Sequence, residues 1–212
     1  MKTYEFGNTE SPTVLIQPVD EHDLAVMDGE VAALREMSVD SFHLIAVKVN
    51  DWNYDLSPWN ARAVFGNDNF GDGAENMLNE ILKLTGDRNK TYYIGGYSLA
   101  GLFSLWAAYQ TDAFKGVAAV SPSVWFPGFL EYAEKHAVHT GRIYLSLGDK
   151  EERTRNPVMS KVGDNIRKLR ELYKEKNPEC ILEWNKGNHF REPDKRMAKG
   201  FSWVMNKTGH SI

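Results

Sequence analysis

Ser98 is the residue of this sequence whose surroundings most strongly suggest covalent chemistry. It stands in the stretch GGYSLAG, with Gly96 two residues before it and Ala100 two residues after it. An apolar strand-like run precedes this stretch and an apolar helix-like run follows it, so the chain must turn tightly at Ser98. The pattern matches the strand–turn–helix motif G-x-S-x-G, which exposes a nucleophilic serine, except that Ala100 replaces the second glycine. The alternative is an ordinary serine that caps the N-terminus of a helix.

A serine hydroxyl is a weak nucleophile unless a base removes its proton and an acid orients that base. In hydrolases with this motif the chain order is serine, acid, histidine. His189, in the stretch NKGNHF after the last expected strand, fits this order, and the alternative is a histidine of a surface loop. His136 and His139 lie before the next strand, and His210 lies in the C-terminal tail. We therefore expect His189 to be the base.

The acid should follow the preceding strand, and the stretch YLSLGDKEE offers three candidates there. Enzymes of this kind usually carry the acid three residues after a glycine, and Glu151 has this spacing from Gly148. We favour Glu151, keep Asp149 as the alternative, and expect Glu152 to point to solvent.

The oxyanion of an acyl-transfer reaction needs two hydrogen-bond donors. We expect the first to be the backbone N–H of Leu99, which directly follows the serine. The second should come from the loop over residues 50–52, and Trp52 is our choice.

Strand-like and helix-like segments alternate along the chain, and the strand-like runs are almost continuously apolar. This is typical of a mostly parallel sheet with helices on both faces. We expect strands over residues 13–19, 42–49, 91–96, 115–123, 142–149 and 180–185. We expect helices over residues 22–37, 74–86, 99–110, 129–137, 157–176 and 193–207, and a long loop over 50–73. Ligand sites of such sheets lie beyond the carboxyl ends of the strands, where the candidate serine, acids and histidine fall.

Composition bounds the remaining possibilities. The 212 residues, of which 42% are hydrophobic, suit a single domain over 1–212. The net charge of −4 and the lack of a basic cluster argue against a nucleic-acid partner. Cys180 is the single cysteine, so no internal disulfide can form. With no apolar leader and no membrane-length apolar run in the sequence, we expect a cytoplasmic protein without membrane contact, metal or cofactor, and leave its oligomeric state open.

Four stretches resemble the α/β-hydrolase superfamily, and more narrowly the esterase group that includes esterase D and the siderophore esterases of the enterobactin type. They are GGYSLAG, VSPSVWF, GDKE and GNHF, in this order, and the resemblance covers residues 42–205. It implies an α/β sheet of six to seven strands with helices on both faces. It also implies hydrolysis of acyl esters with Ser98, Glu151 and His189 as the catalytic triad.

The chain departs from that group at Ala100 and at its N-terminus. The usual leading antiparallel strands are reduced to KTYEF and TVLIQPV. No long insertion follows VSPSVW, so we expect no large lid domain, which argues against a lipase acting on long acyl chains.

Aromatic residues near the expected site are candidates for substrate binding: Trp52, Trp125, Trp59 and Tyr97. Aromatic walls suit apolar, ring-bearing or sugar groups. The alternative is that Trp59 and Trp125 only anchor loops to the core. Arg153 and Arg155 could meet an anionic substrate, although arginines at such positions are more often solvated.

Together these features predict a serine hydrolase that cleaves carboxylic esters of small or of aromatic or sugar-type molecules through an acyl-enzyme intermediate. A peptidase, thioesterase or acyltransferase could use the same triad. A binding module of the same fold without catalysis is a further alternative.

Overall fold

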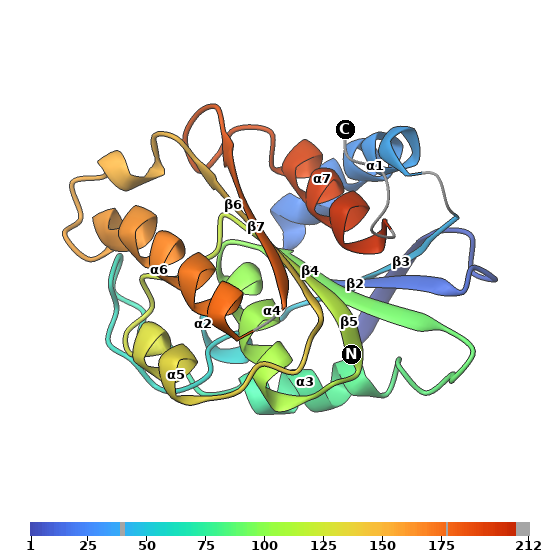
Figure 1. The fold of residues 1–212 in the computed structure, drawn as a ribbon, viewed down its shortest axis with the longest axis horizontal. Coiled ribbons are helices and arrows are strands. Elements are labelled where there is room, and N and C mark those ends of the chain that lie inside the picture. The colour runs from blue at the N-terminus through green and yellow to red at the C-terminus, as the bar shows by residue number, and fades with distance from the viewer. Residues whose placement is uncertain (39–40, 177, 207–212) are drawn as a thin grey trace.

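A seven-stranded sheet runs through the computed structural model, which describes residues 1–38, 41–176 and 178–206 (Figure 1). The strand order is β1-β3-β2-β4-β5-β6-β7. The strands are β1 (Lys2–Gly7), β2 (Thr13–Val19), β3 (His43–Lys48), β4 (Thr91–Tyr97), β5 (Phe114–Val120), β6 (Arg142–Gly148) and β7 (Glu179–Asn185). Strands β2 to β7 pair in parallel, and β1 pairs with β3 in antiparallel orientation at one edge. The prediction of a mostly parallel sheet of six to seven strands is confirmed.

Helices cover both faces of this sheet, as predicted. They are α1 (Glu21–Met37), α2 (Trp52–Asp55), α3 (Ala74–Leu82), α4 (Leu99–Gln110), α5 (Phe129–Lys135), α6 (Val162–Glu175) and α7 (Pro193–Met205), with short 3-10 turns η1 (Glu151–Arg153) and η2 (Met159–Lys161). Helices α1 and α7 lie together on one face, and α3, α4, α5 and α6 supply the apolar core of the other (Figure 1).

The expectation for TVLIQPV is wrong in one respect. This segment is β2, which lies between β3 and β4 and is parallel to both, so it is not a remnant of the leading antiparallel strands. The physical reason is its connection: α1 follows β2 and carries the chain back along the sheet before β3 begins, and a helical crossover of this kind joins parallel strands. Only KTYEF, within β1, keeps the antiparallel direction.

Two predicted helices have different bounds in the structure, one at its start and one at its end. The segment expected as one helix over 157–176 begins with η2 and becomes α-helical at Val162. The helix expected over 74–86 ends at Leu82 and continues as hydrogen-bonded turns. Residues 50–73 hold the short helix α2 and an isolated bridge between Ala61 and Phe70, and the rest is irregular, as expected.

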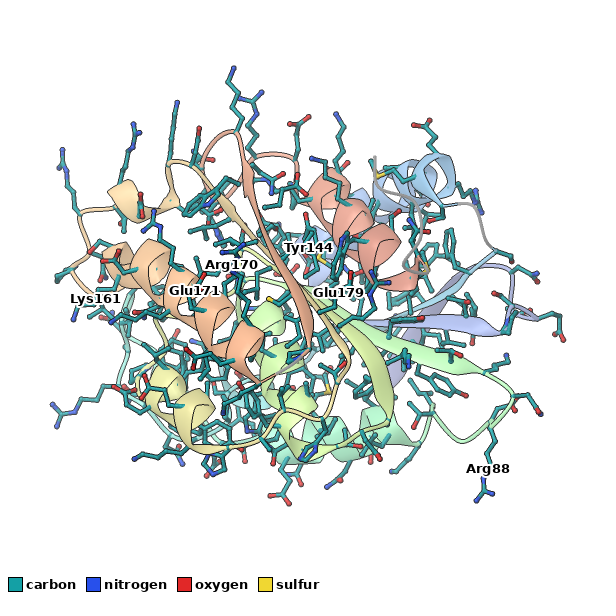
Figure 2. All side chains as sticks on the ribbon, in the orientation of Figure 1. Arg88, Tyr144, Lys161, Arg170, Glu171 and Glu179 are labelled. Carbon is teal, nitrogen blue, oxygen red and sulfur yellow. The ribbon has the colours of Figure 1, made fainter. Side chains whose placement is uncertain are left out.

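Every residue of α4 from Leu99 to Tyr109 is buried, so this helix is enclosed by other parts of the protein on all sides. Its position against β4 and β5 fixes the turn that carries Ser98. Large side chains such as Tyr144 fill the interior, while charged ones such as Arg88 and Lys161 project outward (Figure 2).

The last expected helix, over 193–207, is observed as α7, which ends at Met205. Residue 207 of the expected range, and His210, lie outside the described residues. None of the helices in the described ranges has both the length and the apolar character that a membrane crossing requires.

Candidate active site

Ser98 occupies a strained turn between β4 and α4. Its backbone has φ 57° and ψ −119°, in the left-handed range of φ that residues other than glycine seldom adopt. The turn is held by hydrogen bonds: the Ser98 N–H donates to Val120 O at 3.1 Å, and its carbonyl accepts from the N–H groups of Leu102 and Ser123 at 3.1 and 3.0 Å. Strained backbone of this kind persists where surrounding contacts impose it, and it is frequent at functional sites.

Steric contacts at the turn account for the small residues around the serine. A Cβ atom on Gly96 would lie 2.5 Å from the carbonyl carbon of Ala100 and 2.6 Å from its Cβ. Ala100 itself fits, so its departure from the second glycine of the motif leaves the turn intact. Within the described residues, the Ser98 side chain makes no capping hydrogen bond to α4, so the structure does not support the helix-cap alternative.

The three acidic residues after β6 have different partners. Glu151, at the start of η1, contacts His189, with 2.8 Å between its Oε2 and the ring Nδ1. Asp149 instead accepts a hydrogen bond from the Gly187 N–H at 2.8 Å. Glu152 forms an ion pair with Arg167 at 3.0 Å. The structure thus brings Glu151, and not Asp149, to the imidazole.

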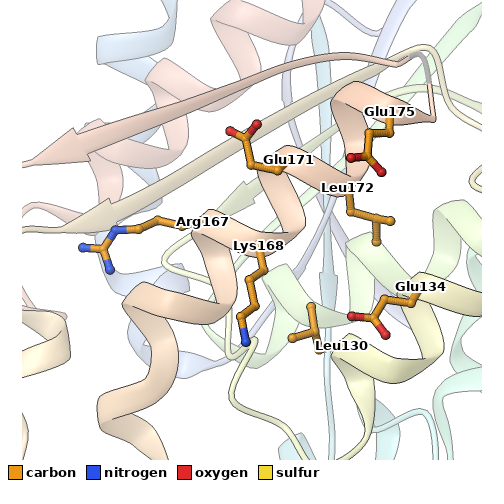
Figure 3. A pocket seen from close by; sticks show the side chains of 7 residues that line it. All are labelled: Leu130, Glu134, Arg167, Lys168, Glu171, Leu172 and Glu175. Atoms are coloured by element: carbon orange, nitrogen blue, oxygen red, sulfur yellow. The ribbon is translucent and has the colours of Figure 1, made fainter.

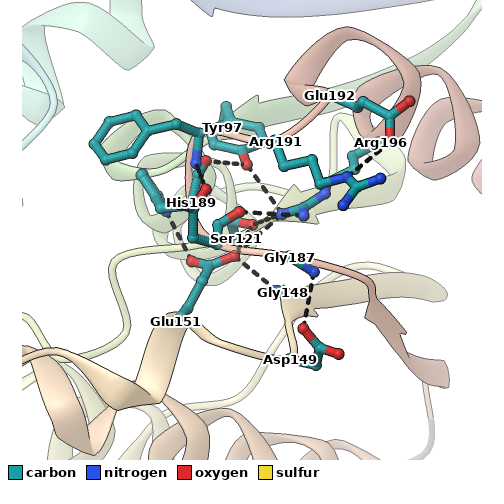
Figure 4. A network of polar contacts seen from close by, with 12 residues as sticks. Tyr97, Ser121, Gly148, Asp149, Glu151, Gly187, His189, Arg191, Glu192 and Arg196 are labelled. Atoms are coloured by element: carbon teal, nitrogen blue, oxygen red, sulfur yellow. Dashed lines mark hydrogen bonds and ion pairs between the residues drawn. The ribbon is translucent and has the colours of Figure 1, made fainter.

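The second oxygen of Glu151 is saturated by donors (Figure 4). Oε1 accepts from Ser121 Oγ at 2.7 Å, from the Gly148 N–H at 2.7 Å and from Arg196 Nη1 at 3.2 Å. Gly148 must be a glycine, because an added Cβ would lie 2.4 Å from Gly187 O and 2.8 Å from Oε1. Burial tends to raise the pKa of Glu151, but hydrogen bonds and charge from His189, with the Ser121 and Gly148 donors, outweigh it and leave the pKa below its ordinary value.

Arg196 and Tyr97 connect this carboxylate to the loop that carries His189. Arg196 is only 3% exposed, and its Nη2 donates to the carbonyls of Lys186 and Asn188 at 3.3 and 3.2 Å. The Tyr97 hydroxyl donates to the His189 carbonyl at 2.6 Å and accepts from Arg196 Nη1 at 3.3 Å.

Sequence reasoning missed Arg196 as well as Ser121 and Ser123. Arg196 lies among the charged residues of PDKRMAKG, which look like the solvated face of a helix. The serines were visible only as part of the stretch VSPSVWF, which gives no separate role to either hydroxyl. Ser121 also has a positive φ, of 44°, and no sequence signal indicated this.

Ser98 and His189 lie together in the lining of two cavities. The first measures about 560 Å³, and its other lining residues include Phe65, Trp125 and Arg153. The second measures about 590 Å³ and is lined by Trp52 and Tyr97, among others. In the described part of the chain, Ser98 Oγ has a hydrogen bond with Ser123 Oγ, at 3.3 Å, and none with His189. Catalytic hydrogen bonds often tighten only when substrate binds.

Both predicted oxyanion donors occupy first positions of helices. Leu99 is the first residue of α4, and Trp52 is the first residue of α2. The N–H groups of a first helical turn have no partner within the helix, so both can serve a ligand.

The predicted aromatic residues do not all reach the site. Trp125 and Trp52 line the first and second cavities, and Tyr97 lines the second. Trp59 is outside the lining of both, which corrects its predicted place at the substrate. Its Nε1–H donates to Pro127 O at 2.9 Å and its ring packs against Phe126 and Tyr132, so it anchors a loop.

Of the two arginines considered for an anionic substrate, Arg153 lines the first cavity and Arg155 lines neither. A depression between α5 and α6 is lined by Leu130, Lys168 and neighbours, and it includes none of the predicted site residues (Figure 3). Across the described ranges, no group of three or more His, Cys, Asp or Glu side chains could hold a metal ion.

Comparison with known proteins gives structural likeness but no sequence match. No protein-family model matches the chain, and neither does any curated protein sequence. A siderophore hydrolase, EstA from Aspergillus nidulans, is 17% identical with a TM-score of 0.62, over 92% of this chain and 82% of that protein.

Two further structures show the same kind of likeness, at low sequence identity. An IroE-like serine hydrolase from Shewanella oneidensis is 14% identical with a TM-score of 0.72, over 90% of this chain and 69% of that one. A carboxylesterase from Bacillus cereus is 16% identical with a TM-score of 0.64, over 97% of this chain and 93% of that one. With this likeness and its seven-stranded, mostly parallel sheet, the chain has the α/β-hydrolase fold.

Proposed function

We propose that this protein is a serine hydrolase that cleaves carboxylic esters, with Ser98 as nucleophile, His189 as base and Glu151 as orienting acid. The observation that carries the proposal is the strained Ser98 turn, which shares its cavities with a His189 ring held 2.8 Å from Glu151. The names of the proteins of similar fold, among them a serine hydrolase and a carboxylesterase, agree with this chemistry.

The first half of the proposed reaction forms an acyl-enzyme. Ser98 Oγ attacks the ester carbonyl carbon while His189 Nε2 takes the hydroxyl proton. The charge of Glu151 stabilises the imidazolium through Nδ1–H, and its lowered pKa keeps that carboxylate ionised. The backbone N–H groups of Leu99 and Trp52 donate hydrogen bonds to the oxyanion that forms. The C–O bond to the alcohol then breaks, and the alcohol leaves with the proton from His189.

The second half repeats these steps with water. His189 removes a proton from a water molecule, which attacks the acyl carbon. The bond from the acyl carbon to Ser98 Oγ then breaks, the serine regains its proton from His189, and the carboxylic acid departs. Each step is a proton transfer or an acyl transfer, so no metal or cofactor is needed.

The side chains that line the two cavities suit small or ring-bearing substrates. Trp125 and Phe65 supply aromatic surface in the first cavity, and Trp52 does so in the second. Such surfaces suit an aromatic acyl group or the face of a sugar. Lys150 and Arg153 at the first cavity add positive charge that would favour an anionic substituent.

A substrate panel tests the proposal. Turnover is measured with a p-nitrophenyl acetate ester, an acetyl thioester and a peptide anilide, each with the Ser98→Ala protein as control. We expect the ester to be the best substrate. A preference for the thioester or the anilide would replace the proposal by a thioesterase or peptidase. No turnover, together with no labelling of Ser98 by a fluorophosphonate, would indicate a binding module.

A further inference from the structure

Arg196 is a buried cation near the start of α7, a helix that carries none of the proposed catalytic residues, and it contacts Glu151, the proposed acid. It belongs to α7, and its side chain is 4% exposed where it pairs with Glu151, whose side chain is 5% exposed. A charge so thoroughly removed from water requires compensation, and the structure supplies it from several groups at once.

The contacts of Arg196 determine how the two oxygens of Glu151 are used. Nη1 donates to Oε1 at 3.2 Å, and Oε1 also receives the donors of Ser121 and Gly148. With Oε1 saturated, Oε2 is left for the Nδ1 of His189, at 2.8 Å. A carboxylate fixed in this way has a single orientation toward the imidazole.

The other side of the guanidinium holds the histidine loop. Nη2 donates to the carbonyls of Lys186 and Asn188, at 3.3 and 3.2 Å, and Asn188 directly precedes His189. Nη1 also reaches the Tyr97 hydroxyl, which itself donates to the His189 carbonyl. The acid and the base come from separate loops, one after β6 and one after β7, and Arg196 contacts both (Figure 4).

We propose that Arg196 is a positioning residue that joins the turn carrying Glu151 to the loop carrying His189 and so maintains the contact between them. A planar guanidinium with five N–H donors can make both sets of contacts at once. A lysine keeps the charge but has one ammonium group, so it can serve only one of the two sides. The inference rests on the proposed function only for its kinetic test.

The spectroscopic test does not depend on any activity. An Nδ1–H proton shared with a carboxylate gives a proton resonance far downfield of the amides, and His189→Gln identifies it by removal. We expect this resonance in the wild type and its loss or broadening in Arg196→Lys. Its absence from the wild type, or its persistence unchanged in Arg196→Lys, would overturn the proposal.

Arg142 provides a matched control for loss of stability. It is also an arginine in an ion pair, with 3.0 Å between its Nε and Glu179, and it also contacts α7, through Val204 O at 3.2 Å. Its partners lie at the opposite end of β6 from Glu151. Arg142→Gln should lower the melting temperature and leave the His189 resonance and kcat unchanged.

The kinetic test is a double-mutant cycle with a short p-nitrophenyl ester. Arg196→Lys should lower kcat by about tenfold to a hundredfold, the effect of displacing a catalytic group by about 1 Å, and leave KM within about threefold. In the Glu151→Gln background the same change should lower kcat by less than about threefold, because Arg196 acts by maintaining the contact of the Glu151 carboxylate with His189, and that carboxylate is already absent. Equal losses in both backgrounds, or full kcat in Arg196→Lys, would contradict the proposal. A wild type without turnover would refute the proposed function, and the resonance would still decide the role of Arg196.

Discussion

Replacing Glu151 by glutamine should abolish most activity through the tautomer of His189. The amide has one oxygen and one NH2 group in place of two acceptor oxygens. The three donors that now meet Oε1, from Ser121, Gly148 and Arg196, require the oxygen on their side. The NH2 group must then face His189 Nδ1, which can accept only if its proton moves to Nε2.

The size of the loss follows from this reversal. A histidine protonated at Nε2 cannot take the proton of Ser98, and it also loses the carboxylate that stabilises the imidazolium. The corresponding aspartate-to-asparagine change in a serine protease triad lowers kcat by about 10⁴, which corresponds to about 5.5 kcal/mol in the activation free energy. We expect a loss of this order in kcat for a p-nitrophenyl ester, measured at a temperature where the variant is folded.

Asp149→Asn is the matched control, because it makes the same chemical change two residues away. Asp149 Oδ1 accepts one hydrogen bond, from the Gly187 N–H at 2.8 Å, and an asparagine oxygen can accept it equally well. We expect kcat to change by less than about threefold, the range of a weakened neutral hydrogen bond. A loss in Asp149→Asn as large as that in Glu151→Gln would refute the assignment of the acid.

The stability of the Glu151 variant has a characteristic dependence on pH. The folded pKa of Glu151 lies below its ordinary value near 4.5, so its ionised form stabilises the wild type above that value. This contribution is lost as the pH falls through the lowered folded pKa. The melting temperatures of wild type and Glu151→Gln should therefore differ at neutral pH and converge in acid. A constant difference across this range would contradict the electrostatic origin.

Two further predictions concern other parts of the molecule. With p-nitrophenyl esters from acetate to palmitate, kcat/KM should peak at acyl chains of roughly two to four carbons and then fall, because the aromatic walls of Phe65 and Trp125 border an open cavity. Each further methylene would add up to ~0.8 kcal/mol of binding free energy only if it were buried in a deep groove. A maximum at long chains would indicate that residues 50–73 act as a lid. Burial raises the pKa of Glu30 well above its ordinary value, so above the ordinary carboxyl range the folded state binds more protons than the unfolded state and the wild type loses stability as the pH rises. Glu30→Gln removes this loss and should therefore raise the melting temperature by an amount that grows with pH. A benefit of Glu30→Gln that is constant or shrinks as pH rises would contradict that reasoning.

The triad candidates could be predicted because each has a local signal. Ser98 is flanked by small residues that the tight turn requires, and Glu151 has a fixed spacing from Gly148. His189 follows the last strand in the chain order that the motif demands. The helix over 99–110 was also predictable, since its apolar residues leave no polar face.

The supporting contacts could not be predicted because they depend on tertiary structure alone. Arg196 lies 45 residues from Glu151 in sequence, and a charge on an amphipathic helix is normally solvated. The parallel direction of β2 follows from its helical connection to β3 through α1, whereas the apolar composition of β2 alone does not distinguish the two directions. The aromatic ring of Trp59 suggests a place at the site, whereas the partners of its Nε1–H and of its ring hold it as a loop anchor.

The most direct test of the proposed chemistry is kcat of the Ser98→Ala protein on the best ester of the panel. The alanine removes only the hydroxyl, and the backbone hydrogen bonds of the turn remain available to it. We predict that nearly all activity disappears, leaving the modest catalysis that binding and an oxyanion hole give without the nucleophile. The melting temperature should show that the variant is folded. A folded Ser98→Ala protein that kept more than about a tenth of the wild-type kcat would contradict the role of Ser98 as the nucleophile.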